Sequence, residues 1–204
     1  MCCLLLVCLY VGSMVVYRYT FFRDHPNTIK RRFTSVLCVS AVSPQVLLAW
    51  THYIRVSPSP PLWALLGIRL EGFVPATLLP LTLTIVLFLG PLTQLAIESP
   101  RGLFHDVKTA LSEYEYISSV RDLRWFRNQV VAPLTEKLVF RACMIPMLVK
   151  CIGPTAAIFI SPLFFSVAFQ FTYTSIFAFI FIRTGHLVGP VLCHSFCNCT
   201  HRGL

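Results

Sequence analysis

Acidic side chains are scarce in this sequence, and their scarcity excludes a whole class of proteins. Only 8 of the 204 residues are Asp or Glu, and charged residues of both signs make up 12% of the chain. A soluble domain is normally about a quarter charged. The hydrophobic share is 56% and the mean hydropathy is +0.72. This small number of charged residues cannot shield so large an apolar surface from water. The composition therefore predicts an integral membrane protein.

Carboxylates are almost absent from the last third of the chain. The eight acids are Asp24, Glu71, Glu98, Asp106, Glu113, Glu115, Asp122 and Glu136. Proton chemistry that needs a carboxylate after residue 122 must therefore use Glu136. Arg141 follows in the same apolar run. Charges in a hydrocarbon environment are expensive, so such a pair is usually either functional or a structural clamp.

A paired cysteine framework is also missing. The nine cysteines are scattered through apolar runs, which is typical of small buried hydrophobes rather than disulfides. Cys193, Cys197, Cys199 and His201 lie close together near the end of the chain. Their Cys-x-Cys step is awkward for one tetrahedral zinc site. The sequence therefore predicts neither a metal nor another cofactor.

Positive charge, by contrast, is abundant and clustered. The formal net charge is +9, and residues 18–32 carry five basic side chains against one acid, Asp24. In a soluble protein this would suggest a nucleic-acid partner. Beside apolar runs, basic loops are better explained by anionic lipid headgroups and by orientation in the bilayer. We therefore expect no nucleic acid, and we expect residues 18–32 to face the cytosol.

Apolar runs predict an all-α, polytopic fold with about six transmembrane helices in one membrane-embedded domain over residues 1–204. The runs cover 1–17, 33–54, 72–97, 133–152, 155–182 and the residues from 187 onward. In the first run basic residues follow the apolar stretch, which favours a retained helix over a signal peptide. Strict alternation across the membrane places residues 98–130 in the cytosol and Glu136 near the cytosolic end of the fourth span.

Residues 98–130 are the one markedly polar stretch. Val107, Leu111, Tyr114 and Ile117 recur there at helical spacing. This pattern indicates an amphipathic helix on the membrane surface. An ordinary solvated helix in a loop is the alternative.

Polar side chains reappear on the last apolar run. His194 and Asn198 are four residues apart and so share one face of a helix. An imidazole and an amide are candidates for stabilising an oxyanion, and Glu136 is the candidate general base. Together they predict hydrolysis within the membrane. Polar groups that only bridge helices are the alternative.

Residues 127–144 read RNQVVAPLTEKLVFRACM, and residues 181–198 read FIRTGHLVGPVLCHSFCN. These two runs resemble the Ras-converting CAAX endopeptidases, the type II CAAX prenyl proteases of the endoplasmic reticulum. Residues 23–35 and 69–72 agree as well. The resemblance covers most of the chain from about residue 18 to 198. It implies a multi-pass protein of the endoplasmic reticulum membrane with an active site accessible from the cytosol.

The resemblance also implies a reaction. The family removes the C-terminal tripeptide from farnesylated or geranylgeranylated CAAX proteins such as Ras-like GTPases, so the implied partners are these proteins and membrane lipid. Its pattern is Glu-Glu-x-x-x-Arg, then Phe-x-x-x-His, then His-x-x-x-Asn. By position Glu136 becomes the base that activates water, Arg141 a supporting residue, and His194 with Asn198 the oxyanion hole.

The chain departs from this pattern at two points. Lys137 replaces the second Glu, four residues before Arg141, which turns an attractive helical pair into a repulsive one. No histidine lies between residues 105 and 186, and Phe169 stands where the middle imidazole is expected. His186 is a possible substitute. The family also continues with further apolar spans, so we expect the domain to be incomplete at its C-terminus.

These departures leave alternatives open. One is a catalytically impaired isoform or pseudoenzyme that still binds prenylated tails, because a base without its imidazole partner loses roughly two to four orders of magnitude in rate. The other is a transporter or scaffold that uses Glu136 and Arg141 as a clamp. An inverted repeat would favour a transporter, and the sequence shows none. We expect measurable binding of a farnesylated peptide with very slow or absent cleavage.

Overall fold

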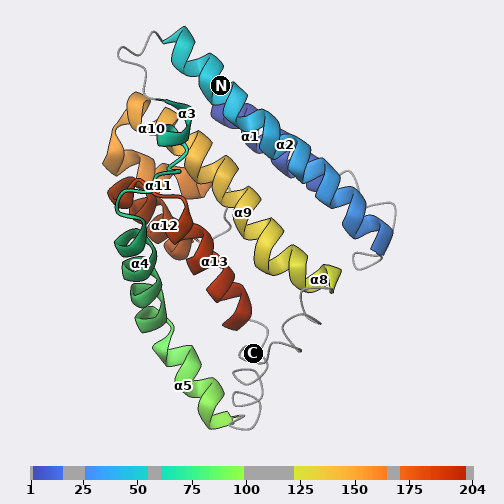
Figure 1. The fold of residues 1–204 in the computed structure, drawn as a ribbon, viewed down its shortest axis with the longest axis vertical. Helices are drawn as coiled ribbons and strands as arrows, with labels where there is room; N and C mark the ends of the chain where they lie inside the picture. The colour runs from blue at the N-terminus through green and yellow to red at the C-terminus, as the bar shows by residue number, and fades with distance from the viewer. Residues whose placement is uncertain (1, 16–25, 55–60, 99–121, 165–170, 201–204) are drawn as a thin grey trace.

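Helices form all the regular structure in the described part of this computed structural model, which covers residues 2–15, 26–54, 61–98, 122–164 and 171–200. The elements are α1 (Cys2–Val15), α2 (Pro26–Tyr53), α3 (Leu62–Leu65), α4 (Phe73–Leu87), α5 (Leu89–Glu98), α8 (Leu123–Phe126), η1 (Arg127–Val131), α9 (Ala132–Lys137), η2 (Leu138–Cys143), α10 (Met144–Ile152), α11 (Pro154–Leu163), α12 (Phe171–Thr184) and α13 (Val188–Thr200) (Figure 1). The segments η1 and η2 are π-helical. The predicted all-α fold is confirmed.

The helices α1 and α2 lie side by side along one edge of the molecule (Figure 1). The part of α2 from Thr28 to Tyr53 is the one helix among the described residues that is long and apolar enough to cross a membrane, with a mean hydropathy of 1.6. The helix begins at Pro26, whose fixed φ suits a first turn. Residues 30–32 therefore lie on α2 rather than in the predicted basic loop, while residues 18–25 lie outside the described chain.

Five segments, from α8 to α10, follow one another without a break and form what we call the central helix, residues 123–152. It lies between the α1–α2 pair and α13 (Figure 1). It starts ten residues before the predicted fourth span at residue 133. It ends where predicted, because Gly153 adopts φ +83° and Pro154 follows.

Two of the predicted spans each contain two helices. Residues 72–97 form α4 and α5, which are separated at Phe88. The single helix predicted for residues 155–182 is wrong, since α11 ends at Leu163 and packs against α12. Pro162 sits at that end, and a proline both lacks a donor and crowds the preceding turn. Of the stretch at residues 98–130 that was predicted to carry a surface helix, residues 99–121 lie outside the described residues and residues 123–130 belong to the central helix; Phe169 also lies outside the described residues.

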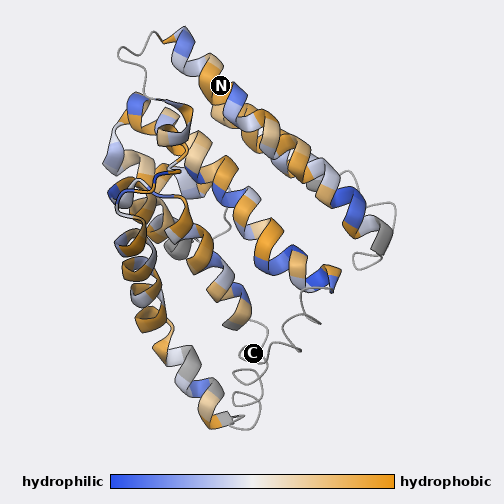
Figure 2. Ribbon diagram, viewed as in Figure 1, coloured by the Kyte–Doolittle hydropathy of each residue, from blue (hydrophilic) through white to orange (hydrophobic). Residues whose placement is uncertain are grey.

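Apolar side chains cover outward faces as well as the core. The main core cluster joins α1, α2 and the central helix through residues such as Leu6, Val36 and Met144. Exposed large apolar side chains include Leu37, Val42, Leu48, Leu78, Leu79 and Val86, on α2 and α4. Figure 2 shows α4 as mostly hydrophobic and α2 as a mixture of hydrophobic and hydrophilic residues. A helix that is apolar on its outer face suits a lipid environment.

Backbone contact is very close where α13 meets α4. A Cβ built on Gly189 would lie 2.6 Å from the carbonyl oxygen of Ala76. No side chain can occupy that position without moving backbone, so glycine is required there for the two helices to touch. The contact fixes the start of α13, the helix that carries His194.

Candidate active site

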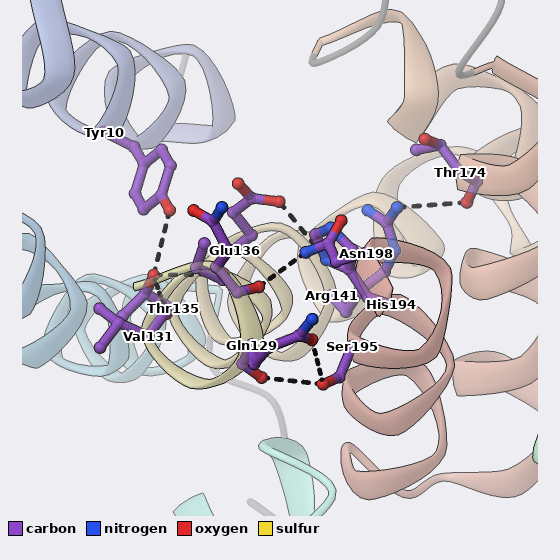
Figure 3. Close-up of polar contacts among 12 residues, drawn as sticks. Tyr10, Gln129, Val131, Thr135, Glu136, Arg141, Thr174, His194, Ser195 and Asn198 are labelled. Atoms are coloured by element: carbon purple, nitrogen blue, oxygen red, sulfur yellow. Dashed lines mark hydrogen bonds and ion pairs between the residues drawn. The ribbon is translucent and has the colours of Figure 1, made fainter. Parts of the chain in front are cut away.

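Glu136 and His194 come together from two helices that are far apart in sequence. Glu136 lies on α9 and His194 on α13, and the Oε2 and Nδ1 atoms are 3.6 Å apart (Figure 3). The two side chains are 14% and 18% exposed, respectively, so neither is sealed inside the core. The structure thus unites the carboxylate and the imidazole that the sequence placed in one site.

Asn198 lies one turn beyond His194 on α13. Its Nδ2 donates a hydrogen bond to the backbone carbonyl of Asn128, at 2.7 Å. The amide carries two N–H groups. One of these N–H groups bonds to η1, so the second N–H group is the one available to an oxyanion.

Pro133 explains why η1 has carbonyl groups to offer. The N–H of Ala132 bonds to the carbonyl of Arg127, five residues back, which is the π-helical pattern. In the same pattern the carbonyl of Asn128 would receive the N–H of residue 133, but proline has none. The next carbonyl, that of Gln129, would lose the same donor only in an α-helical turn. Asn128 and Gln129 each offer a backbone carbonyl to α13.

Side chains of α13 occupy both acceptors. Asn198 bonds to Asn128, and the Ser195 hydroxyl contacts Gln129 at both its backbone carbonyl and Oε1, each at 2.9 Å (Figure 3). These contacts fix the rotation of α13 against the central helix, and His194 is thereby held toward Glu136. We did not predict Ser195 or Gln129 from the sequence. A proline four or five residues after an Asn-Gln pair was the available signal.

Lys137 and Arg141 both reach toward α12. The Lys137 Nζ lies 4.8 Å from the centroid of the Phe177 ring, and the Arg141 Nη2 donates to the carbonyl of Thr174 at 3.2 Å. The Phe177 ring in turn stacks on His194, with centroids 6.4 Å apart and an interplanar angle of 28°. Lys137 thus contacts an aromatic face. In the family pattern this position is a second Glu, which would pair with the Arg at position 141.

Tyr10 connects the N-terminal helix to the helix of Glu136. The Thr135 hydroxyl donates to the carbonyl of Val131 at 2.7 Å, which uses its hydrogen. The Tyr10 hydroxyl, 3.1 Å from Thr135 Oγ1, is therefore the donor in that contact. Its ring also meets Phe140 edge-on at 5.2 Å. Tyr10 is fully buried and contacts Thr135, the residue that precedes Glu136; no periodic pattern in the sequence pointed to it.

His186, the possible substitute base partner, lies elsewhere. It is buried in the link between α12 and α13, where its Nε2 is 3.6 Å from the position of a Cβ built on Gly72. No contact among the described residues joins it to Glu136. The imidazole beside Glu136 is that of His194.

Comparisons with known proteins find similar sequences over most of the chain. Residues 122–200 match the family described as type II CAAX prenyl endopeptidase Rce1-like, and this range includes Glu136, Arg141, His194 and Asn198. The curated CAAX prenyl protease 2 of Homo sapiens is 50% identical, with 96% of this chain and 68% of that protein aligned. The Rattus norvegicus protein of the same name is 51% identical, with 96% and 66% aligned.

A more distant relative extends the match to plants. The CAAX prenyl protease 2 of Arabidopsis thaliana is 30% identical, over 93% of this chain and 73% of that protein. No solved structure matches the chain. The chain spans about two thirds of the length of the human and rat relatives. The resemblance seen in the two sequence runs is confirmed, and the chain belongs to the type II CAAX prenyl endopeptidases, a family of proteases.

Proposed function

We propose that this chain cuts prenylated CAAX proteins, such as Ras-like GTPases, before their last three residues. Glu136 acts as the base that activates water, and His194 with Asn198 stabilises the oxyanion. The observation that carries the proposal is the 3.6 Å approach of Glu136 Oε2 to His194 Nδ1 in surroundings that are mainly apolar. The name shared by the curated relatives, CAAX prenyl protease 2, supports the substrate class.

The reaction needs one proton to move from water to Glu136 and then from Glu136 to the leaving amine. Glu136 takes a proton from water as the water oxygen adds to the scissile carbonyl carbon. The carbonyl oxygen becomes an oxyanion, which accepts hydrogen bonds from His194 and Asn198. The carbon–nitrogen bond then breaks, and Glu136 returns the proton to the leaving amine. The products are a prenylated protein that ends in its lipidated cysteine and a free tripeptide.

The geometry of His194 suits both halves of this step. Its Nδ1 faces Glu136, and in the tautomer that carries the proton on Nε2 the ring can donate that proton to the oxyanion while Nδ1 is an acceptor. Once Glu136 has taken the proton of water, the carboxylic acid can donate to Nδ1. The present separation is longer than a hydrogen bond, and such contacts often tighten only when substrate is bound.

The proposed setting is the endoplasmic reticulum membrane, with about six spans and the site open to the cytosol. Basic residues at the start of α2 and the apolar outer faces of α2 and α4 support it. We expect residues 18–32 and 98–130 to be labelled by an impermeant cysteine reagent added outside sealed microsomes, each after introduction of a single cysteine. Protection of either stretch would overturn this topology.

A non-cleaving protein that binds prenylated tails is the second candidate. Lys137 in place of the family's second Glu favours it, as does the absence of a histidine between residues 105 and 186. Binding and tripeptide release should be measured together on a farnesylated CAAX peptide, with the chain in lipid nanodiscs. We expect clear binding and slow release.

Two variants decide between the mechanisms. Release that disappears in Glu136→Ala but persists in His186→Ala supports the site described above. Release that disappears in both would give His186 the role of the missing imidazole. Release that survives Glu136→Ala would reject Glu136 as the base.

A further inference from the structure

Positive charge is in excess around the candidate base. The central helix brings one acidic side chain, Glu136, next to two basic ones, Lys137 and Arg141. Lys137 is 5% exposed and Arg141 is 1% exposed. Among the residues that the structure describes, neither basic side chain forms an ion pair with a carboxylate. An uncompensated charge in apolar surroundings is strongly unfavourable, so the cluster is suited to receive an anion.

Arg141 has donors for that anion. Its Nη2 donates to Thr174, while Nε and Nη1 are buried and have no hydrogen-bond partner within the described chain. These two nitrogens carry three N–H groups between them. Guanidinium N–H groups match the two oxygens of a carboxylate, and such charge-assisted bonds are the strong ones. A neutral group could satisfy the donors but would leave the charge unpaired.

The distance along the helix suits a short peptide. Glu136 and His194 are the partly exposed members of the cluster, so a ligand meets these two first. Arg141 lies five residues further along the helix, a rise of about 7.5 Å. Three extended residues span about 10 Å. A peptide whose scissile bond lies at Glu136 therefore brings a terminal carboxylate three residues later within reach of the Arg141 side chain.

We propose that Arg141, with Lys137 beside it, binds the C-terminal carboxylate of the peptide that is cut at Glu136. This inference rests on the proposed function and adds the feature of the substrate that sets the cleavage position. The carboxylate fixes the register of the peptide. The bond that then lies at Glu136 is the one three residues from the end, whatever the identity of those residues.

An anionic lipid phosphate shares this chemistry, so the experiment must separate the two sources. The probes are two farnesylated CAAX tetrapeptides that differ only at the C-terminus, one a free acid and one the isosteric primary amide. Their affinities are measured in nanodiscs of phosphatidylcholine, with and without phosphatidic acid. We expect the acid to bind roughly tenfold to a hundredfold more tightly than the amide, and phosphatidic acid to leave that ratio unchanged.

Variants assign the preference to named side chains. Arg141→Gln should bring the acid-to-amide affinity ratio close to one, and Lys137→Met should lower it partly. Arg183→Gln and Lys150→Met remove the same charges from exposed positions and should leave the ratio as in the parent. Thermal melting identifies any variant that fails to fold. If Arg141→Gln does so, Lys137→Met and the acid–amide comparison in the parent still test the proposal.

Each contrary result has its own meaning. Equal binding of acid and amide by the parent chain would overturn the carboxylate site and leave the proposed function standing. Loss of the acid preference on addition of phosphatidic acid would assign the cluster to lipid headgroups and overturn it too. If neither peptide bound, the proposed function would fail, and this inference with it.

Discussion

The part of α2 from Val39 to Tyr53 and the seam between the central helix and α13 use polar side chains in opposite ways. In α2 the hydroxyls of Ser43 and Thr51 bond to carbonyls of their own helix, Val39 at 2.7 Å and Leu48 at 2.8 Å. At the seam, Ser195 and Asn198 bond across to another helix. A hydroxyl that is satisfied within its own helix leaves packing free to be decided by apolar shape, whereas one that bonds across a seam fixes register.

This difference separates a stretch of α2 whose packing is decided by apolar shape from a seam that needs defined positions, while Tyr10 on α1 makes its own cross-helix bond to Thr135. Apolar side chains in α1 and α2 can be exchanged for others of similar volume at small cost. Cross-helix bonds to single carbonyl oxygens cannot be exchanged in the same way. The seam is also where Glu136 and His194 meet, and the buried Lys137 and Arg141 lie next to it against α12. The variants below test whether the two regions really differ in this respect.

The largest effect is expected at Glu136. Glu136→Gln keeps the shape of the side chain but removes the base, so tripeptide release should fall by about two to four orders of magnitude relative to the parent. The melting temperature should change little. Glu71→Gln, at an exposed position, is the matched control and should keep the parental rate. A release rate for Glu136→Gln within a few fold of the parental rate would show that the seam is not the active site.

Tyr10 should be the costliest truncation in the α1–α2 pair. Tyr10→Ala deletes a fully buried ring, for which losses of about 3–5 kcal/mol in unfolding free energy are usual. Tyr10→Phe removes only the hydrogen bond to Thr135 and should cost about 0.5–1.5 kcal/mol. Denaturation of the purified chain in detergent measures both. If Tyr10→Phe cost as much as Tyr10→Ala, the hydrogen bond to Thr135 would contribute more to stability than the packing of the ring. The α1–α2 pair would then depend on a cross-helix hydrogen bond, as the seam does.

Lys137→Glu should stabilise the fold. The change gives the free guanidinium N–H groups of Arg141 a carboxylate at i,i+4 and removes a like charge. It also removes the contact of Lys137 with the Phe177 ring, worth about 0.5–2 kcal/mol, so the net gain should be modest. A melting comparison in detergent is the measurement. A variant that melts no higher than the parent would show that the contact with the Phe177 ring already offsets the cost of burying the lysine charge.

A matched pair of serines tests the difference between the two regions through single hydroxyl groups. Ser195→Ala removes the cross-helix bond and leaves the Gln129 carbonyl without that donor, so it should cost about 1–3 kcal/mol. Ser43→Ala removes a bond within its own helix and should change stability by about 0.5 kcal/mol or less. Equal costs for the two would erase the distinction between the regions.

Much of the site could be predicted from the sequence because its chemistry is unusual for its surroundings. Glu136 is the one acidic residue after residue 122. The spacing of His194 and Asn198 puts both on one helical face. The two helices at residues 155–182 could not be predicted from hydropathy, because the average stays high when one apolar helix follows another. Tyr10 and Ser195 were missed because their partners are 125 and 66 residues away in sequence.

The two π-helical segments also bear on how the chain can change in evolution. A π-helical turn is equivalent to one extra residue inserted into an α-helix. Loss of one residue within η2 can therefore be absorbed by a return to α-helix, and the residues on either side keep their facing. Loss of one residue from α10 would instead rotate everything beyond it by about 100°. The central helix thus has two places where its length can vary by one residue while Glu136 keeps the same neighbours.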